Sequence, residues 1–595
     1  MAIAPMSRLL ASSFLILAAL ALSSARAQIL LDGEWSPRYD EDQPERIPGP
    51  ELGDYLGLPI NDAARQRAEA WDASRLTLPE EQCRVHVAPY IYRGPLDLRI
   101  WQEKDPDTQQ VIAIKNYIST WSQFRTIWMD GRPHPPDYAP HTWMGFSTGK
   151  WDGDVLTVYT THLKTGWIRR NGLVMSDQAT MTEHFIRHGD YLTHVTILKD
   201  PAYLTEPLIK SEDFVLNLHA AGASWVYHCR PAEEIVNRPK DQVPNYLPGE
   251  NPFMLEFPKR HGVPENAALG GAETMYPEYR LRMTKSDRPV SKNRVLPRPT
   301  PPAGIQVQKV QGNVYLLVGD GANMLVQTGE QGALLVDTGR AELSAKMLAE
   351  VRKLSAKPIR WILNTGPDAD HVGGNEAVAN LVGSSTHIAL VNTPFSTAVN
   401  TVAIVASDPV LTHMSAKEGN RPAYPVEAWP TETYQGETDE VFYNGEAAQM
   451  WHAPAAHTDG DSIVFFRRSD VIAAGDLFDT DHYPIIDLTR GGSLQGIING
   501  LNRVIDLAIP EFEEEGGTMV VPGHGRICDE IDVVEYRDML TIIRDRLQAM
   551  IRKGMTLPQI LASRPTLDYD PLYGATSGPW TTDMFVEAAY RSLMR

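Results

Sequence analysis

The sequence predicts an α+β protein in which a β-rich N-terminal domain precedes a mixed α/β domain and a helical C-terminal extension. Three patterns predict this order: short alternating strands before residue 235, strands followed by strand–helix alternation after Ile305, and 3–4 spacing of apolar residues after Val533. With 595 residues, of which 43% are hydrophobic, the chain is long enough for several buried cores. The predicted segments are a signal peptide at 1–27, a β-rich domain at 28–235, a proline-rich linker at 236–303, the α/β domain at 304–532 and the helical extension at 533–595.

The first 27 residues have the pattern of a cleavable export signal. Arg8 precedes the apolar stretch 9–22, and Ala25-Arg26-Ala27 places small residues at the cleavage positions. This stretch of about 14 residues is too short to cross ~30 Å of hydrocarbon comfortably, which disfavours a membrane anchor. We therefore expect a mature chain from Gln28, periplasmic or secreted, without a stable membrane span.

Export would place the chain in an oxidising compartment, where cysteines can pair. The sequence has three cysteines, Cys83, Cys229 and Cys528. Cys83 and Cys229 flank much of the first domain and could form a disulfide, but sequence does not give their separation, so the pairing stays open.

The formal charge of −20, without a long run of one sign, argues against a nucleic-acid partner, because phosphates require a clustered basic face. We expect a small-molecule partner, and the sequence does not indicate an oligomeric state.

The β-rich domain is predicted from alternating apolar and polar residues, and its strands are expected at 111–114, 124–129, 155–159 and 192–197. Asp130-Gly131 and Asp152-Gly153 predict turns between strands. A barrel and a sandwich both fit this pattern, and residues 50–75 look partly helical.

Two features of this domain allow a functional interpretation beside a structural one. Residues 145–149 read Gly-Phe-Ser-Thr-Gly, which matches the nucleophile elbow of serine hydrolases, but the flanks lack the strand–turn–helix context, so a hairpin turn is predicted. The tryptophans could pack in the core or line a ligand cavity, and core packing is favoured: Trp121, Trp128, Trp143 and Trp151.

The α/β domain is predicted to follow a stiff polyproline-type spacer at residues 296–302. Strands are expected at 314–318, 323–327, 332–337 and 359–363, with an amphipathic helix at 343–355. Asp337, at the end of one strand, is predicted to form a turn, with support of the site as the alternative.

Polar side chains of metal-ligand type stand at the ends of four predicted strands in this domain. They are Asp368, Asp370 and His371 after strand 359–363, His457 before strand 462–466, Asp476 after strand 471–474, and His524 after strand 519–521. Loops at strand ends converge on one crevice, and His and Asp supply donors at the ~2.0–2.2 Å that zinc or iron requires.

In this order, Asp370-His371, His457-Thr458 with Gly460-Asp461, Gly475-Asp476 and Gly523-His524-Gly525 resemble the metallo-β-lactamase superfamily. The resemblance covers residues 305–530 and implies an αββα sandwich with the site at one edge. The family's first motif is His-x-His-x-Asp-His, and here Gly366 and Asp368 stand at the two leading histidine positions. The first domain resembles N-terminal regions of uncharacterised secreted bacterial proteins, which implies no particular function.

The resemblance implies two metal positions, of which one keeps all its ligands. Asp370, His371 and His524, with the shared Asp476, would hold one metal ion. His457 and Asp476 would remain for the other ion, with Asp368 as an additional oxygen donor. One zinc ion is therefore favoured over two. Iron or manganese is the alternative, since some iron-binding members carry a carboxylate at the position of Asp368.

The expected function is that of a metal-dependent hydrolase of the cell envelope. A bound metal lowers the pKa of its water to about 7, Asp368 could act as general base, and His457 or His482 could stabilise an oxyanion. Two further functions stay open: a non-catalytic binding module with a degenerate site, and an iron-dependent oxidoreductase. The substrate is determined by pocket loops and cannot be inferred.

Overall fold

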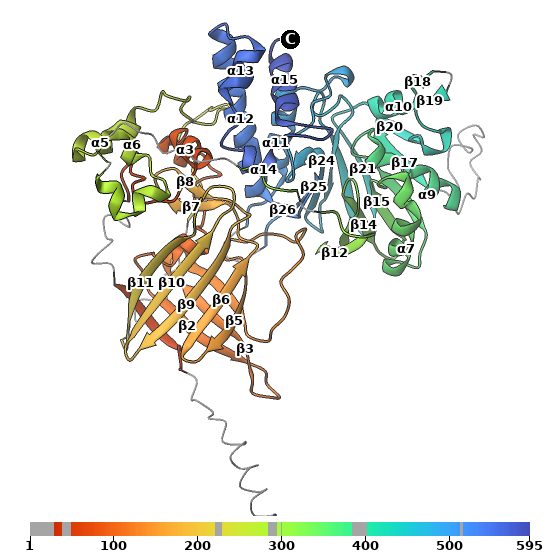
Figure 1. Ribbon diagram of the computed structural model, residues 1–595. Helices are drawn as coiled ribbons and strands as arrows, with labels where there is room; N and C mark the ends of the chain where they lie inside the picture. The colour runs from red at the N-terminus through yellow and green to blue at the C-terminus, as the bar shows by residue number, and fades with distance from the viewer. Residues whose placement is uncertain are drawn as a thin grey trace, which may run out of the picture.

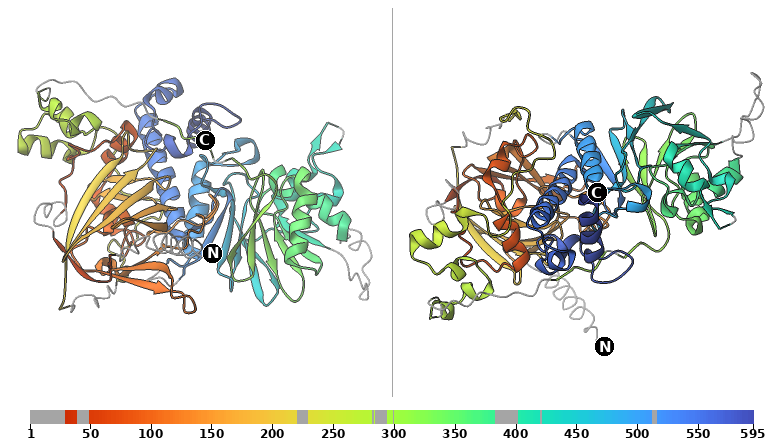
Figure 2. Two further views of the ribbon diagram at one scale, coloured as in Figure 1. Left: turned by 60° about the horizontal axis from the view of Figure 1, so that its bottom comes forward. Right: turned by 90° about the horizontal axis from the view of Figure 1, so that it is seen from above.

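The computed structural model describes residues 29–38, 49–219, 229–281, 283, 294–298, 300–382, 402–419, 421–511 and 516–595. The predicted signal peptide lies outside the described residues. Within these ranges, no helix has the length and apolar character that crossing a membrane requires. A β-barrel and an α/β sandwich lie side by side, and C-terminal helices pack between them (Figures 1 and 2).

The N-terminal strands close into a barrel with the order β1-β11-β10-β9-β6-β5-β4-β3-β2. Neighbouring strands are antiparallel except β4 and β5, which run parallel. The strands are β1 (Gly33–Arg38), β2 (Leu98–Lys104), β3 (Val111–Ile118), β4 (Gln123–Trp128), β5 (Phe146–Asp152), β6 (Val155–Thr161), β9 (Thr180–His188), β10 (Tyr191–Lys199) and β11 (Leu208–Leu216). Of the two predicted alternatives, the barrel is the one formed.

The two ends of the barrel differ. Tight hairpins join β2 to β3, β5 to β6 and β9 to β10 at one end. At the other end, which we call the capped end, the connections carry α3 (Asp62–Glu69), α4 (Ala88–Ile91), β7 (Gly166–Arg169) and β8 (Leu173–Met175). Asp152-Gly153 forms its predicted hairpin turn, whereas Asp130-Gly131 begins a long connection at 129–145, because the parallel pairing of β4 and β5 requires a crossing.

The Gly-Phe-Ser-Thr-Gly segment is neither a nucleophile elbow nor the predicted hairpin turn. Residues 146–149 lie within β5, paired with β6. The Ser147 hydroxyl is buried and lies 3.0 Å from the Thr160 hydroxyl. Because this serine faces the barrel interior, it cannot be an exposed nucleophile.

Charged side chains fill the middle of the barrel. Arg125 donates to both carboxylate oxygens of Glu183. His194 lies between Glu183 and Glu212, at 2.9 and 2.8 Å. Arg125, Glu183 and His194 are fully buried, so each charge depends on its partners for the solvation that it has lost. The lumen is therefore a packed core, in which these charges lie among buried apolar side chains such as Phe185 and Leu192, and not an open channel.

Part of the predicted linker is folded against the first domain. It contains η3 (Pro252–Leu255), α5 (Glu256–His261), α6 (Glu265–Ala268), η4 (Ala272–Met275) and η5 (Pro277–Leu281). The backbone N–H of Tyr55 donates to the carbonyl of Ala268, and that of Gly271 donates to Leu58. The Arg65 guanidinium donates to the carbonyls of Leu269 and Gly270.

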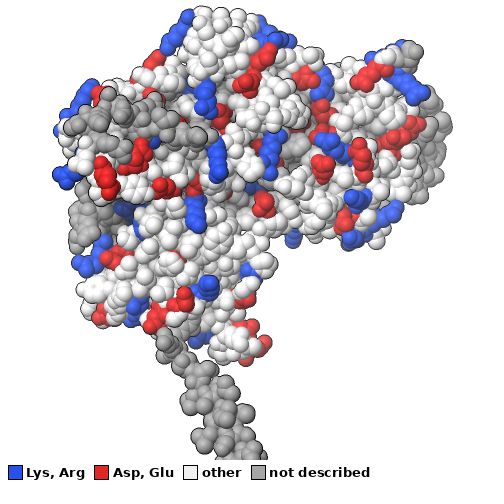
Figure 3. All heavy atoms as spheres, viewed as in Figure 1, with Lys and Arg blue, Asp and Glu red and all other residues white. Residues whose placement is uncertain are grey.

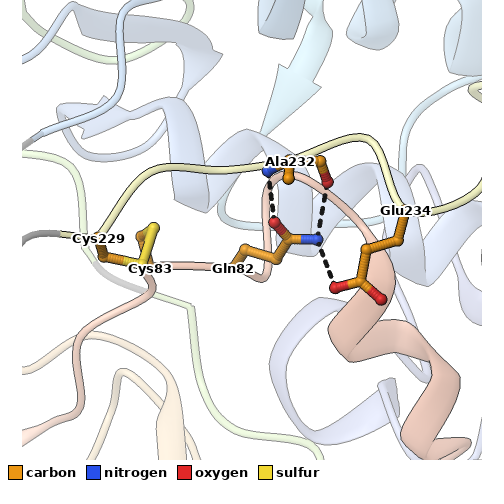
Figure 4. Close-up of a disulfide and its surroundings, with 5 residues drawn as sticks. All are labelled: Gln82, Cys83, Cys229, Ala232 and Glu234. Atoms are coloured by element: carbon orange, nitrogen blue, oxygen red, sulfur yellow. Dashed lines mark hydrogen bonds between the residues drawn. A yellow bond between two sulfur atoms is a disulfide. The ribbon is translucent and has the colours of Figure 1, made fainter.

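A disulfide joins Cys83 to Cys229, as the sequence allowed (Figure 4). The neighbouring Gln82 side chain reinforces the same junction, since it accepts from the backbone N–H of Ala232 and donates to the Ala232 carbonyl and to Glu234. The third cysteine, Cys528, is buried and free.

The C-terminal domain is an αββα sandwich of two facing sheets. The first sheet has the order β12-β13-β14-β15-β16-β17-β20 and the second the order β21-β22-β23-β24-β25-β26. The strands are β12 (Gln306–Gln311), β13 (Val314–Val318), β14 (Met324–Thr328), β15 (Ala333–Val336), β16 (Ile359–Leu363), β17 (Ala403–Ser407), β20 (Glu432–Tyr434), β21 (Thr438–Tyr443), β22 (Glu446–His452), β23 (Ser462–Phe466), β24 (Val471–Asp479), β25 (Met519–His524) and β26 (Cys528–Asp529). Apolar side chains from both sheets, such as Leu334 and Val464, form the core between them.

Helices cover the outer faces of both sheets. α7 (Ser344–Leu354) buries Met347 and Val351 against the first sheet, with α9 (Asn375–Val382) beside it. α10 (Asp408–Ser415) packs on β17. α11 (Leu494–Leu507) and the long α12 (Glu530–Arg552) cover the second sheet.

The helical extension begins at Glu530, three residues before its predicted start, because Asp529 and Asp532 form a capping box there. It continues through α13 (Leu557–Ser563), α14 (Asp570–Tyr573) and α15 (Thr582–Leu593). Ion pairs join α12 to the first domain, for example Arg67–Glu535 at 2.8 Å and Arg75–Asp538 at 2.7 Å. The extension thus connects the barrel to the sandwich. On the face shown in Figure 3, acidic and basic side chains are interspersed.

Candidate metal centre

The side chains predicted as metal ligands come from four segments at one edge of the sandwich. Asp368 follows β16 and caps the short α8 (Ala369–Val372), which carries Asp370 and His371. His457 lies in the loop before β23, and His524 is the last residue of β25. Because β24 and β25 are parallel, their carboxyl ends lie at the same edge, and this brings Asp476 beside the strand end that carries His524.

Three of the predicted ligands form a first triad: His371, Asp476 and His524. Their donor atoms lie within 4.8 Å of one another. The Nε2 atom of His371 is 3.1 Å from Asp476 Oδ1, and the Nε2 atom of His524 is 3.7 Å from the same oxygen. Asp370 stands at the edge of this group, with Oδ2 3.5 Å from His524 Nε2.

A second triad consists of Asp368, His457 and Asp476, and its donor atoms also lie within 4.8 Å of one another. His457 Nδ1 is 2.9 Å from Asp476 Oδ2, and His457 Nε2 is 3.7 Å from Asp368 Oδ2. Asp476 therefore turns one carboxylate oxygen toward each triad. The structure brings together all the residues that the sequence nominated.

Two donor atoms of the second triad have lost water without gaining a hydrogen bond. Asp368 Oδ2 and His457 Nδ1 are buried, and neither has a hydrogen-bond partner among the residues that the structure describes. His457 Nδ1 is close to Asp476, but the angles do not form a hydrogen bond. Buried donors that lie within 4.8 Å of one another and lack hydrogen bonds favour a cation among them, so the donor set suits a divalent metal.

The acidic surroundings favour positive charge at this edge. Burial opposes protonation of His371, but the Asp476 and Asp337 carboxylates raise its pKa well above the usual range. For His457, burial is likewise outweighed, mainly by Asp476, and the pKa rises to about 9. Burial opposes ionisation of Asp476, yet the two imidazoles hold its pKa well below the ordinary value. Without a metal, protons on the histidines would balance the carboxylates, so metal binding must displace them.

Comparison with known proteins agrees with this geometry. The model of the metallo-beta-lactamase superfamily matches residues 307–524, which contain both triads. These residues form a metallo-beta-lactamase superfamily domain. A curated relative, the linear primary-alkylsulfatase of Pseudomonas sp. (strain ATCC 19151), is 23% identical over 259 residues, which are 39% of this chain and 47% of the relative. The chain thus spans about half the length of this relative.

Solved structures overlap this chain over part of its length. The inverting sec-alkylsulfatase Pisa1 from Pseudomonas sp. gives a TM-score of 0.36 at 15% identity, over 48% of this chain and 50% of that chain. A metallo-beta-lactamase from Pontibacter korlensis gives a TM-score of 0.30 at 17% identity, over 40% of this chain and 98% of that chain.

Asp337 contacts the metal-ligand candidate His371 and fixes the orientation of its imidazole. It has a φ of 59° at the end of β15, and its carboxylate lies 2.8 Å from His371 Nδ1. The same carboxylate accepts from the backbone N–H and the hydroxyl of Thr365, at 2.9 and 2.6 Å. With Nδ1 engaged, the lone pair of Nε2 is directed at the metal position. The sequence predicted a turn at Asp337 and gave support of the site as the alternative. These contacts favour the alternative.

The glycine at a family histidine position is not forced by crowding. An added Cβ at Gly366 would lie 3.5 Å from Asp461 Oδ1, an ordinary contact, and no other atom lies within 4 Å. By contrast, a Cβ at Gly523 would lie 2.6 Å from Asp476 Oδ1. Gly523 is therefore required by the close approach of β24 and β25, whereas Gly366 leaves space beside the second triad.

Arg490 is the site residue that sequence reasoning missed. Its guanidinium donates to Asp368 Oδ1 at 2.7 Å and to Asp487 Oδ2 at 2.6 Å. Partial burial opposes the charge of Arg490, but the two carboxylates outweigh it and raise the pKa of the guanidinium above its usual range. Arg490 lies before α11, 122 positions along the chain from the Asp368 that it contacts, so no local pattern marked the pair.

The ligands line a small pocket of about 150 Å³, whose wall also includes Arg490, His482, Pro484 and Ile485. His482 lies 2.8 Å from Asp479 Oδ2, and although burial opposes its charge, Asp479 raises its pKa to about 9. His482 therefore carries a proton at neutral pH, in agreement with the pocket role considered from the sequence. The pocket combines two cationic side chains with the acidic ligand cluster.

The first domain holds the segment that carries His524. The backbone N–H of Ile527 donates to the carbonyl of Tyr138 in the long β4–β5 connection, at 3.0 Å. Arg526 forms an ion pair with Asp177 of the barrel at 3.1 Å. The Asn323 amide donates to the carbonyls of Pro522 and Gly525. The position of the His524 ligand thus depends on both domains.

Proposed function

We propose that this chain is a metal-dependent hydrolase of small anionic esters, with sulfate esters as the first candidates. The observation that supports it is the pair of donor triads that share Asp476 at the floor of a pocket that also contains Arg490. The alkylsulfatase relative suggests the sulfate ester, and its 23% identity over part of each chain leaves that substrate as a proposal.

The residues fit a resident zinc ion, with iron or manganese as the alternative. Asp370, His371, His524 and Asp476 would hold the tighter ion, and Asp368 and His457, with the shared Asp476, a weaker one. A bound divalent ion supplies a water whose pKa falls to about 7. We also propose that the chain acts in the periplasm or outside the cell, on the basis of its N-terminal pattern.

Three side chains of the pocket would have separate roles in the reaction. Arg490 binds and orients the anionic group of the ester, since a guanidinium donates through a planar fork. Arg490 also holds Asp368 through Oδ1, which leaves the unbonded Oδ2 to accept a proton from the attacking water. His482, whose ring nitrogens face the Tyr483 carbonyl and Asp479, lines the same pocket and adds positive charge that favours the developing charge on the leaving oxygen.

The experiment compares esters of equal leaving group and different charge on the purified full chain. 4-Nitrophenyl sulfate and 4-nitrophenyl acetate are assayed with zinc, together with Arg490→Gln and the control Arg503→Gln. Arg503 is a half-exposed arginine that pairs with Glu437 outside the pocket. We expect Arg490→Gln to raise KM for the sulfate by about ten-fold and to leave KM for the acetate unchanged, because one charge-assisted contact to the anion is lost. The kcat for both esters should fall alike, because Asp368 loses its ion pair. Preferred hydrolysis of the acetate, or an unchanged sulfate KM, would contradict the proposal.

One observation favours a second candidate, a binding module without turnover. Gly366 removes a donor, and the ion pair with Arg490 occupies one oxygen of Asp368. In that case the chain would bind zinc and the sulfate ester without releasing 4-nitrophenol. The identity of the metal that co-purifies tests the third possibility, because an iron-dependent oxidoreductase requires iron, whereas zinc would fit the two other candidates.

A further inference from the structure

The metal pocket has one apolar side. Pro484 and Ile485 form it, whereas the other described residues that line the pocket are aspartates, histidines and one arginine. Ile485 is 38% exposed, so part of its apolar surface faces solvent at the pocket. Small-molecule sites typically combine an apolar wall with a few polar groups that orient the ligand. An ester whose organic group covered Ile485 would remove that surface from water.

The residues on either side of this apolar pair are buried. Tyr483 is 1% exposed and Ile486 is 4% exposed, and both belong to the core that the second sheet shares with the helical extension. Pro484 and Ile485 are therefore held at both ends by buried neighbours. Their position at the pocket depends on how the extension holds this segment.

The extension binds Tyr483 through both its backbone and its side chain. The backbone N–H donates to the carbonyl of Tyr573, and the carbonyl accepts from the indole N–H of Trp580, both at 3.1 Å. The hydroxyl lies 3.1 Å from Asp570 Oδ1 and 3.2 Å from the carbonyl of Thr566, so it can donate to either. These partners come from three places in the extension: the segment after α13, α14 itself, and the segment before α15.

The ring of Tyr483 is also fixed. It stacks on Phe585 of α15, with ring centroids 4.4 Å apart and an angle of 4° between the planes. Burial, together with the nearby Asp570 carboxylate, raises the pKa of Tyr483 well above its usual range, so the hydroxyl keeps its proton. Tyr483 therefore cannot shift without the loss of several buried contacts.

The extension also holds the part of this loop that carries Arg490. The Ser592 hydroxyl accepts from the backbone N–H of Leu494 at 3.0 Å, and Arg595 donates to the carbonyl of Leu488 at 3.0 Å. Arg490 lies between these two contacts in the sequence. The apolar pair and the arginine of the pocket thus belong to one loop, and the extension fixes it at several points.

We propose that Ile485 selects the organic group of the ester, and that the helical extension positions Ile485 through Tyr483. The proposal rests on the binding of the ester's anionic group by Arg490. Ile485 then contacts the carbon chain while Arg490 and the metal centre face the anion, so the site prefers esters with an apolar organic group. None of the described residues that line the pocket belongs to the extension, which acts through the loop alone.

Sulfonates test the selection by Ile485 on the zinc-loaded full chain, because their carbon–sulfur bond is not hydrolysed. Methanesulfonate and 1-hexanesulfonate share the anionic group and differ in the organic group. Calorimetry gives Kd of both ligands for wild type, Ile485→Ala and the control Ile509→Ala, at a 59% exposed position outside the pocket. We expect Ile485→Ala to weaken 1-hexanesulfonate about five-fold and to leave methanesulfonate unchanged, with no effect of Ile509→Ala.

Two variants test the positioning role of the extension. Tyr483→Phe removes the hydroxyl but keeps the stacked ring, and Trp580→Phe removes the donor to the Tyr483 carbonyl. Each should lower the ratio of the two affinities about three-fold. Tyr590→Phe, on α15 and outside the pocket, loses the same hydroxyl group and should keep the wild-type ratio. A general loss of folded protein would affect both ligands equally, so the ratio reports the position of Ile485.

Equal affinity of wild type for the two sulfonates, or an unchanged ratio in Ile485→Ala, would overturn the proposal. An unchanged ratio in both Tyr483→Phe and Trp580→Phe would overturn the role of the extension. Failure of the proposed function gives a different result. In that case 4-nitrophenyl sulfate is not cleaved, or Arg490→Gln leaves both affinities unchanged, while Ile485→Ala still lowers the ratio.

Discussion

The imidazole of His371 is held by Asp337, whose carboxylate lies 2.8 Å from Nδ1. Both side chains are buried, so this contact is shielded from solvent. It leaves Nε2 of His371 facing Asp476 at 3.1 Å. The contact determines which nitrogen of His371 can bind a metal ion, and this gives the first prediction.

Asp337→Asn should weaken zinc binding by about 10- to 100-fold, because an amide holds the imidazole less firmly and lowers its basicity. Isothermal titration of the metal-free full chain with zinc measures the change. Asp320→Asn, at an exposed position, is the matched control. Equal affinities of the two variants would show that Asp337 only shapes the turn after β15.

Gly366→His should increase the amount of tightly bound zinc from about one to about two equivalents, since it restores a donor next to His457 and Asp368. The space beside Gly366 accommodates a Cβ without a clash. Gly366→Ala adds only that carbon and should leave the metal content unchanged. Identical metal content in the two variants, measured by plasma mass spectrometry, would argue against a second site here.

The stability of the barrel should fall at alkaline pH. Burial opposes the charge of His194, but Glu183 and Glu212 raise its pKa to about 9, above the ordinary value near 6.5. The charged form therefore stabilises the fold fully below about pH 6.5, and this contribution is lost as the pH rises toward 9, up to about 3 kcal/mol in total.

Chemical unfolding of the full chain between pH 6.5 and 9.5 measures this loss. His194→Gln should be less stable at pH 6.5 and should show a flatter pH profile. His188→Gln, at an exposed position on the same hairpin, should keep the wild-type profile. A wild-type stability that stays constant over this range would contradict a charged His194.

Reduction of the Cys83–Cys229 disulfide should lower stability substantially. The two cysteines are 146 residues apart, and closure of a loop of that size in the unfolded chain corresponds to up to about 5 kcal/mol. Thermal unfolding with and without reductant measures the effect, and Cys83→Ser/Cys229→Ser should reproduce it. The Cys528→Ala variant should still be destabilised by reductant. If it is not, the effect of reductant comes from Cys528 and the prediction is wrong.

Much of the site was predictable because its residues stand next to strand ends that have clear sequence patterns. His371, His457 and His524 each adjoin a strand or helix that begins or ends within a few residues of its predicted position. β24 was predicted to stop at Ala474, but it continues through Asp479, so Asp476 lies within a strand. A short apolar run marks the start of such a strand, whereas parallel pairing with β25 extends it to Asp479.

The contacts that sequence did not reveal join residues far apart in the chain. Arg490 reaches Asp368 across 122 positions, and Arg67 reaches Glu535 across 468. Neither pair leaves a local pattern, because any surface arginine has the same appearance in sequence. Barrel closure is similar, since β1 pairs with β11 far along the chain, for example Trp35 with Leu216.

The most direct test of the account is the zinc content of the full chain and of Asp476→Ala, with Asp154→Ala in an exposed turn as control. Asp476 turns an oxygen toward both triads, so its loss should reduce zinc from about one equivalent to below about 0.2, while the control keeps the wild-type content. Zinc content that is the same in Asp476→Ala and wild type, or absent from wild type even after zinc is added, would contradict the assignment of a metal centre.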